Sequence, residues 1–383
     1  MNQVMVASAV RTPLGAFGGK LASLSEQQLG AAAMGEVVRR AGIAPSLIDE
    51  VIVGIAKQTS NPSNGGRHAM LLARLPEDIP AYTVQRQSAS GLQAVANGCW
   101  AIQCGDAGVV LAGGMESASR IPFEIYNARY DFTDRRREIV DALLAHETGA
   151  QPPETYGMVT KALVAENIAR KYALSEGELA AFAEESFQKA ISAGERGLDQ
   201  EDAFPVTVKE GKKEELIIQD ELQKRALLLA SPADGAAMCL LASRGRAEAL
   251  GLPIMASIVA TGIAAGDPRY AGMAVVAASR MAIGRANLTL RDVDVIELNE
   301  MSAAECLAVL REWESWGLDR EALAERVNPS GGALARGNPW GAAGAVLLTK
   351  DLHELRRRGG RFGMVAVAAE DGQGMALVLM NQG

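Results

Sequence analysis

One serine of this chain lies in a setting that suits nucleophilic chemistry. Ser88 falls within Gln85–Gly91, and apolar residues then recur with helical spacing. A helix start carries unpaired backbone N–H groups, which can stabilise an oxyanion that forms beside the hydroxyl. A serine hydroxyl needs a partnered base before it attacks an acyl group. We therefore expect Ser88 at a helix start, either as a nucleophile or as a small polar capping residue.

Two asparagines carry amides that can hydrogen-bond a carbonyl group or a water molecule. Asn299 ends the strand-like run Val293–Asn299, and Asn338 opens the segment Asn338–Gly344 ahead of a helical pattern. If both face one pocket, they can polarise a bound ligand. Turn stabilisation is the alternative role for both residues.

An internal duplication must position these residues. Each half contains a helix-like segment, a strand-like segment, a second helix and a second strand. The matched segments are Glu26–Arg40 with Ala271–Arg285, Ile48–Gly54 with Val293–Asn299, the helices that follow Ser88 and Asn338, and Val109–Ala112 with Met364–Ala368. This alternation predicts layered α/β halves with mostly parallel strands. A pseudo-twofold axis would place the Ser88 and Asn338 turns, both at helix starts, face to face.

A more charged insertion separates the halves. We expect an N-terminal half of residues 1–117 plus 234–255, an inserted loop domain of residues 118–233, and a C-terminal half of residues 256–383. Ser25 with Gln28, and Ser175 with Glu178, match the capping-box spacing. Gly194 is expected to stop the helix that Ser175 opens. The charged run through Arg135–Arg137 is expected to be a solvated face.

Composition excludes several classes of function. The 383 residues carry a net charge of −8, which disfavours nucleic acid and anionic membranes as partners. The four cysteines and three histidines show no metal-ligand spacing, so we expect buried free thiols and no metal. The sequence contains no signal peptide and no membrane-length apolar run. We expect a soluble cytoplasmic protein.

Several motifs, in order and spread over nearly the whole chain, resemble those of the thiolase family, most closely its bacterial acetyl-CoA acetyltransferases. The motifs are Val6–Gly15, Gln85–Gly91, Ala112–Ser117, Ser231–Ala237, Asn299–Glu300, Val327–Ala333 and Gly337–Gly344. The resemblance implies an α/β thiolase fold, with a duplicated five-layer αβαβα core and an inserted loop domain. It also implies homodimers or homotetramers.

The resemblance implies catalytic groups that this chain has mostly replaced. Family thiolases transfer acyl groups through a cysteine that a histidine activates, and a second cysteine exchanges a proton. An asparagine holds a water that helps bind the thioester oxygen. The first three positions hold Ser88, Asn338 and Ala368, and only the asparagine persists, as Asn299. An amide cannot accept a proton near neutral pH. We therefore expect ordinary acetoacetyl-CoA thiolysis to be absent or very slow.

Other positions of the implied pocket also differ. Glu370 and Asp371 replace glycines, and the resemblance places them opposite Ser88. Either can act as a general base or form a structural ion pair with Arg336, and at most one is expected to face the pocket. Met301 and Trp340 are expected to fill volume that substrate vacates.

Coenzyme A thioesters are the implied substrates, and no covalently bound cofactor is expected. Met158 and Ser231 match residues that line the family's pantetheine channel, although the segment 214–229 is shorter than in the family. Three functions stay open. The first is a thiolase-family acyltransferase that acts on an acyl-thioester through Ser88. The second is a catalytically silent homologue, a binding or structural subunit in a complex with an active thiolase. The third is a non-covalent lyase or hydratase that uses Glu370 or Asp371.

Overall fold

A mixed ten-stranded sheet runs through the centre of the chain in a computed structural model that describes residues 2–59, 61–126, 128–129 and 138–382. Nine strands follow the order β12-β13-β14-β11-β1-β10-β5-β3-β4, and β2 pairs with β10. The strands are β1 (Val4–Arg11), β2 (Gly15–Ala16), β3 (Glu50–Gly54), β4 (Ala81–Val84), β5 (Val109–Ser117), β10 (Ala233–Ser243), β11 (Ala256–Ala265), β12 (Val295–Leu298), β13 (Phe362–Ala368) and β14 (Gln373–Asn381). The charged run at residues 130–137 lies outside the described residues.

The strand order repeats and so reflects the duplication. In the N-terminal half the order is β3-β5-β10-β1, and in the C-terminal half it is β12-β13-β14-β11. The two halves meet where β1 pairs with β11, with Val4 opposite Ile258 and Val6 opposite Ala256. Four strands of one half therefore have counterparts at the same places in the other, whereas β4 and β2 belong to the N-terminal half alone in the described part of the chain.

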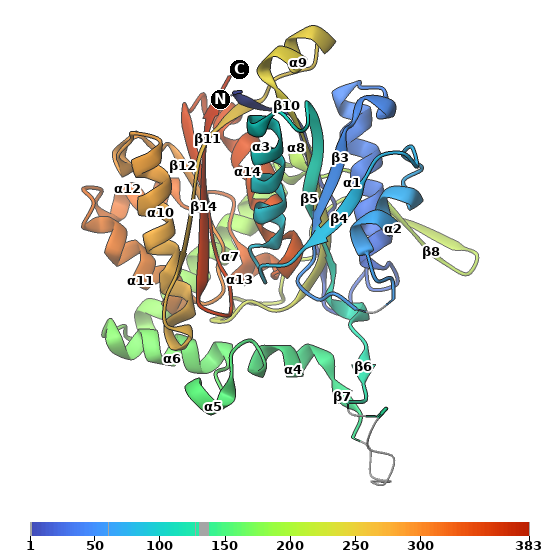
Figure 1. Cartoon of the computed structure of the whole chain (residues 1–383). Coiled ribbons are helices and arrows are strands. Elements are labelled where there is room, and N and C mark those ends of the chain that lie inside the picture. Colours follow the sequence, from blue (N-terminus) through green and yellow to red (C-terminus); the bar gives the residue numbers. More distant parts are fainter. Residues whose placement is uncertain (1, 60, 127, 130–137, 383) are drawn as a thin grey trace.

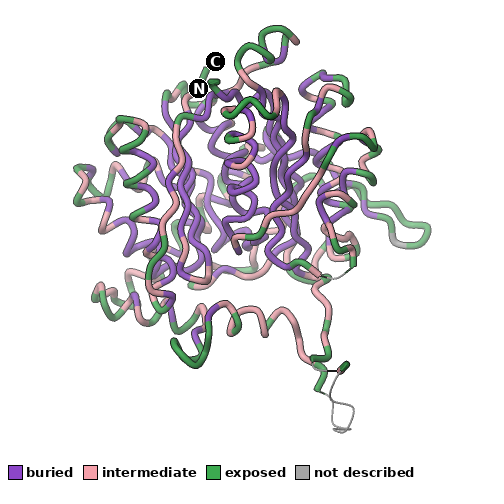
Figure 2. The backbone as a smooth tube through the Cα atoms, viewed as in Figure 1, coloured by how far each residue is buried: buried purple, intermediate pink, exposed green. Residues whose placement is uncertain are grey.

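Helices lie on both outer faces and between the two halves of the sheet (Figure 1). One outer layer holds α1 (Glu26–Ala41) and α2 (Gly65–Leu72), and the central layer holds α3 (Ser90–Cys104) and α14 (Ala343–Arg358). The other outer layer holds α10 (Ala274–Arg285), α11 (Ala303–Glu314) and α12 (Arg320–Arg326). Figure 2 shows that most of the central sheet and of the two central helices is buried, whereas β4 and the second part of β11 are largely half-buried or exposed. The αβαβα architecture is therefore confirmed.

The prediction of mostly parallel strands is wrong. Parallel pairing occurs between β12 and β13, between β3 and β4, and between β3 and β5. The remaining pairs in this sheet are antiparallel. A tight turn at residues 369–372 joins β13 to β14, and so short a connection permits only antiparallel pairing. This turn carries Glu370 and Asp371.

The inserted segment contributes helices and short strands, some of which lie along the lower end of the sheet in Figure 1 while one hairpin projects to the side. They are β6 (Phe123–Glu124), β7 (Val140–Asp141), α4 (Ala142–Thr148), α5 (Pro153–Tyr156), α6 (Lys161–Lys171), α7 (Glu176–Glu195), α8 (Asp199–Asp202), β8 (Val206–Glu210) and β9 (Lys213–Ile217). Both predicted capping boxes are present, at Ser25 and at Ser175. The predicted stop at Gly194 is wrong, because the chain first turns left-handed at Gly197, where φ is 71°.

The two central helices approach each other closely because glycine lies at their contact. A Cβ at Gly91 would fall 2.7 Å from the carbonyl oxygen of Gly341, and one at Gly344 would fall 2.7 Å from Cβ of Leu92. Real Cβ atoms do not tolerate such distances. The glycines of both motifs therefore bring the segments that precede α3 and α14 together.

A buried charge cluster joins β1, α8, the segment after β9 and α13 (Ala333–Arg336). Nη1 of Arg11 lies 2.7 Å from Oδ1 of Asp220, and its Nη2 lies 3.0 Å from Oδ1 of Asp202. Nη1 of Arg336 lies 2.9 Å from Oδ2 of Asp199 and also pairs with Asp220. The predicted ion pair between Arg336 and Glu370 or Asp371 is therefore wrong. The guanidinium pairs instead with two aspartates of the insertion, Asp199 and Asp220.

We expect Arg336→Met to lower the free energy of unfolding by about 3–5 kcal/mol, because Arg11 would then be left to balance three buried aspartates, Asp199, Asp202 and Asp220. Urea unfolding at neutral pH measures the loss. Arg269→Met is the matched control, since the exposed pair of Arg269 with Asp267 contributes about 0–1 kcal/mol. Equal losses in the two variants would contradict this account of the cluster.

Candidate active site

Ser88 is fully buried in the turn between β4 and α3. Gln87, just before it, has a φ of +47°, an uncommon left-handed conformation for a residue with a side chain. Oγ of Ser90 accepts from the backbone N–H of Arg86 at 2.7 Å and donates to the carbonyl oxygen of Gln87 at 2.6 Å. These bonds fix the turn. As predicted, Ser88 lies at a helix start, two residues before the first residue of α3.

Glu370 holds Ser88 at both its hydroxyl and its backbone. Oγ of Ser88 donates to Oε1 of Glu370 at 2.7 Å, and the Ser88 N–H donates to Oε2 at 3.3 Å. Burial raises the pKa of the Glu370 carboxyl above its ordinary value, while the bonds from Ser88 act in the opposite direction. A hydroxyl and a carboxyl group that can accept its proton thus lie within hydrogen-bond reach.

Asp371 is not part of this pair. Its Oδ2 accepts from Nε2 of Gln373 at 2.6 Å, and Gln373 in turn accepts from Arg86. The prediction that only one of the two acidic residues faces the pocket agrees with these contacts. They lie on a turn, however, and not on a strand as the alternation argument assumed.

Both predicted amides reach the same spot, and a sulfur atom occupies it. Nδ2 of Asn338 lies 2.9 Å from Sδ of Met301, and Nδ2 of Asn299 lies 3.3 Å from it. Nδ2 of Asn338 also donates to Oγ of Ser88 at 3.4 Å, and the Met301 sulfur lies 3.9 Å from that oxygen. The thioether therefore fills the space between the two amides and the hydroxyl, as the sequence predicted for Met301.

The backbone around Asn338 is pinned by the segment before β10. The N–H of Asn338 donates to the carbonyl oxygen of Ser231 at 2.8 Å, and the N–H of Ala233 donates to the carbonyl oxygen of Asn338 at 3.1 Å. The prediction that Asn338 starts a helix is wrong by several residues, since a 3₁₀ turn (Trp340–Ala342) precedes α14. Pro339 disfavours helical backbone at the residue before it.

The two residues matched to a pantetheine channel lie apart from Ser88. The side chain of Met158 is exposed, and Ser231 is half-buried. Neither is among the residues that line a small cavity of about 20 Å³ beside Met301 and Glu370. For Ser231, the contact to the site is the backbone bond to Asn338.

Three charged residues that line that cavity were not identified from the sequence: Glu147, Lys161 and Glu305. Nζ of Lys161 donates to the carbonyl oxygen of Ala230 at 3.3 Å. Glu305 is buried, and its burial raises its pKa to about 7. Ser302 and Glu305 show capping-box spacing at the start of α11, and Oγ of Ser302 accepts from the Glu305 N–H at 3.1 Å. That signal was available, but it indicates a helix start and not a pocket.

The buried carboxyl of Glu116 forms hydrogen bonds with backbone segments near the site. Oε2 of Glu116 accepts from the N–H of Ala56 at 2.9 Å and from the N–H of Gly341 at 3.0 Å. Burial raises its pKa to about 8 against the effect of these bonds. Glu116 therefore links the ends of β3 and β5 to the turn that follows Asn338.

In the part of the chain that the structure describes, no cysteine or histidine side chain is a hydrogen-bond partner of Ser88. The side-chain hydrogen-bond partners of Ser88 there are Glu370, Asn338 and Met301. Three cysteines are buried, and burial raises their pKa values: Cys99, Cys239 and Cys306. Cys104 is exposed, contrary to the prediction that all four thiols are buried. His353 is largely buried, and burial lowers its pKa.

The fold and this site can now be compared with known proteins. Two family profiles match the chain, "Thiolase, N-terminal domain" over residues 4–244 and "Thiolase, C-terminal domain" over residues 252–381. The acetyl-CoA acetyltransferase of Pseudomonas aeruginosa is 36% identical over 403 residues, with 99% of each chain covered. The β-ketoadipyl-CoA thiolase of the same organism is 36% identical over 402 residues, again with 99% of each covered.

Solved structures agree with the sequence relatives. The crystal structure of the Bacillus anthracis acetyl-CoA acetyltransferase matches with a TM-score of 0.92 and 31% identity, covering 100% of this chain and 99% of the other. Human mitochondrial 3-ketoacyl-CoA thiolase in complex with CoA matches with a TM-score of 0.91 and 29% identity, covering 100% and 98%. The chain belongs to the thiolase family. Among its described residues, no helix is long and apolar enough to cross a membrane.

We expect the stability of the protein to fall as pH rises from about 4.5 to about 8, partly through Glu116. The folded chain keeps the Glu116 proton up to about pH 8, whereas an unfolded chain releases it near 4.5. The folded state thus binds more protons in this window, and the free energy of unfolding declines with pH. In Glu116→Gln we expect the free energy of unfolding to decline less steeply with pH, by up to about 1.4 kcal/mol per pH unit.

Urea unfolding of both proteins across this pH range measures the difference between their slopes. The control is Glu248→Gln, at an exposed carboxyl of α9 (Arg244–Leu250), which should leave the slope unchanged. Parallel curves for wild type and Glu116→Gln would show that Glu116 is ionised throughout.

Proposed function

We propose that this protein is a thiolase-family acyltransferase that acts on an acyl-CoA thioester through Ser88, with Glu370 as its general base. The observation that supports this most directly is the 2.7 Å hydrogen bond from Oγ of Ser88 to Oε1 of Glu370. A hydroxyl becomes a useful nucleophile when a base accepts its proton in the transition state. Because its pKa is raised, the carboxylate of Glu370 is a stronger base than that of an ordinary glutamate.

The proposed step balances without any further reactant. Oγ of Ser88 forms a bond to the thioester carbonyl carbon while its proton passes to Glu370. The carbon–sulfur bond then breaks, and the proton leaves with the coenzyme A thiolate as a thiol. The products are free coenzyme A and an ester on Ser88. The amides of Asn299 and Asn338 both point to one spot beside Ser88, where they can donate to the carbonyl oxygen once the Met301 sulfur has moved aside.

The relatives support the substrate class. Their names specify acetyl-CoA and β-ketoadipyl-CoA, and one similar structure contains CoA. We infer a CoA thioester as substrate, without a covalently bound cofactor, with Met158 and Ser231 near the pantetheine. We further infer a cytoplasmic homodimer or homotetramer.

The first prediction from this proposal is an acyl-enzyme. Incubation with acetyl-CoA should raise the intact mass by one acetyl group, and peptide mapping should place the group on Ser88. Ser88→Ala should abolish the adduct, and Glu370→Gln should slow its formation by about 10²–10⁴-fold. Ser315→Ala is the matched control, because this exposed serine donates to the carbonyl oxygen of Glu312 and its loss should leave the acetyl group on Ser88. An unmodified mass after prolonged incubation would refute the proposal.

The second prediction concerns ordinary thiolysis. We expect cleavage of acetoacetyl-CoA by coenzyme A to be at least about 100-fold slower than in a cysteine-dependent relative, because a serine ester exchanges with thiols poorly and Asn338 cannot accept a proton. Loss of the thioester absorbance at neutral pH, compared with the P. aeruginosa acetyl-CoA acetyltransferase, measures the ratio. Equal rates would contradict this prediction.

A silent homologue is the second candidate, and the position of the Met301 sulfur favours it. That sulfur occupies the spot at which both amides converge. A silent binding subunit predicts no adduct even in Met301→Ala, which empties the spot, and co-purification with a cysteine-bearing thiolase from source cells. The acyltransferase predicts that Met301→Ala forms the adduct at least as fast as wild type.

The non-covalent lyase or hydratase now depends on Glu370, because Asp371 bonds to Gln373. It predicts turnover that survives Ser88→Ala and is lost in Glu370→Gln. The acyltransferase predicts that both substitutions suppress turnover. The same pair of variants therefore separates the two reactions.

A further inference from the structure

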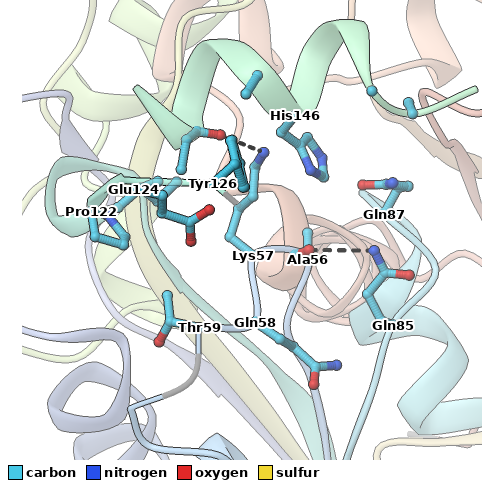
Figure 3. A pocket seen from close by; sticks show the side chains of 15 residues that line it. Ala56, Lys57, Gln58, Thr59, Gln85, Gln87, Pro122, Glu124, Tyr126 and His146 are labelled. Carbon is cyan, nitrogen blue, oxygen red and sulfur yellow. Dashed lines mark hydrogen bonds between the residues drawn. The ribbon is translucent and has the colours of Figure 1, made fainter. Parts of the chain in front are cut away.

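A second cavity, larger than the one beside Glu370, opens on the same end of the molecule. It has a volume of about 500 Å³ and lies between the loop after β3, the segment before α3, β6 and α4 (Figure 3). We call it the Lys57 cavity. Ser88, Met158 and Ser231 are not among the residues that line it. Its lining shares no residue with the small cavity beside Glu370, although Gln87 directly precedes Ser88 and Glu370 is close enough to act on the charge of Lys57.

Lys57 is the buried cation of this cavity. It is only 9% exposed, and its Nζ donates to the carbonyl oxygen of Ala142 at the long distance of 3.5 Å. The same nitrogen lies 5.7 Å from the ring centre of Trp340. An ammonium group has three donors, so one long bond leaves most of its hydrogen-bonding capacity open to the cavity.

Two further polar atoms around the cavity have no hydrogen-bond partner within the described part of the chain. They are Oε1 of Gln87, whose residue is 8% exposed, and Nε2 of His146. Figure 3 shows Gln87 and His146 on one side of Lys57 and Glu124 on the other. A buried polar atom without a partner costs about 1–3 kcal/mol. A bound polar molecule would remove this cost at several places at once.

The walls limit what such a molecule can be. The positive charge of Lys57 favours an anionic group on the ligand, whereas the negative charge of Glu124 on the opposite wall disfavours a second one. Oε1 of Gln87 is an acceptor and can bind a hydrogen-bond donor on the ligand. The remaining wall residues include apolar groups that suit a short hydrocarbon body: Ala56, Ile121, Pro122, Ala142 and Ala145.

We propose that the Lys57 cavity binds a small monocarboxylic acid that also carries a hydrogen-bond donor, such as a hydroxy acid. Its carboxylate accepts from Nζ of Lys57, and its hydroxyl donates to Oε1 of Gln87 or to Glu124. Its hydrocarbon body packs on the alanines of α4. Binding here does not require acyl transfer at Ser88.

Calorimetric titration of the full chain with three probes of matched length tests the proposal: 6-hydroxyhexanoate, hexanoate and 1,6-hexanediol. We expect the hydroxy acid to bind most tightly, with a dissociation constant of about 1 mM or below, and the diol most weakly. Ser88→Ala should bind the hydroxy acid as wild type does. That result separates this site from the proposed acyltransferase, whose adduct needs Ser88.

The matched variants are Lys57→Met and Lys20→Met. Lys57→Met keeps the length of the side chain but removes its charge, and we expect about tenfold or greater weakening for both acids and no change for the diol. Lys20 is exposed and pairs with Glu215, so Lys20→Met should bind all three probes as wild type does. Equal affinity of wild type and Lys57→Met for the hydroxy acid would overturn the proposal, as would three probes of equal strength.

A pH series gives a second measurement that needs no variant. Burial lowers the pKa of Lys57 to about 8, despite nearby charges that raise it. The titratable groups that face Lys57 are Glu116 on β5, Glu370 on the turn after β13, Glu124 on β6 and Asp141 on β7, with His146 on α4. Affinity for hexanoate should fall as pH rises from 7 to above 8, because the ammonium loses its proton. A flat profile would exclude Lys57 as the carboxylate-binding group.

Discussion

The close contact between α3 and α14 is the constraint on which the site depends. Glycine at Gly91 and Gly344 permits the close approach at this crossing, where a Cβ would collide. The turns ahead of the two helices carry Ser88 and Asn338, so the contact between the halves brings these residues within hydrogen-bond distance. Glu116 strengthens the arrangement, because its carboxyl accepts from the N–H groups of Ala56 and Gly341 on either side.

Much of the fold could be predicted from the sequence, because its signals are local. Capping boxes, helical spacing and the repeated segments depend on neighbours along the chain, and the structure contains them. Strand direction depends on partners that local patterns do not specify. The short turn at Glu370–Gly372 forces antiparallel pairing between β13 and β14. The apolar residues of the two strands do not indicate the direction in which the strands pair.

Site residues could be predicted where residue type and motif position agreed. Residues whose partners lie far away in the sequence could not be placed in this way. Ser88, Asn299, Asn338 and Glu370 do converge. Arg336 pairs with aspartates more than a hundred residues away in sequence, and no local pattern links it to them. Lys57 stands beside no catalytic motif, and its cavity forms only when α4 folds over the loop after β3.

If Ser88 is the nucleophile, as we propose, the Met301 side chain bears on how substrate would reach it. A thioether side chain is unbranched and has three rotatable bonds. Rotation about those bonds can move its sulfur away from the two amides while the main chain and the bonds that pin Asn338 stay in place. Shut and accessible forms of this enzyme centre would then differ by one rotamer on an otherwise rigid frame. Substrate would meet a barrier set by local side-chain packing and not by movement of a loop.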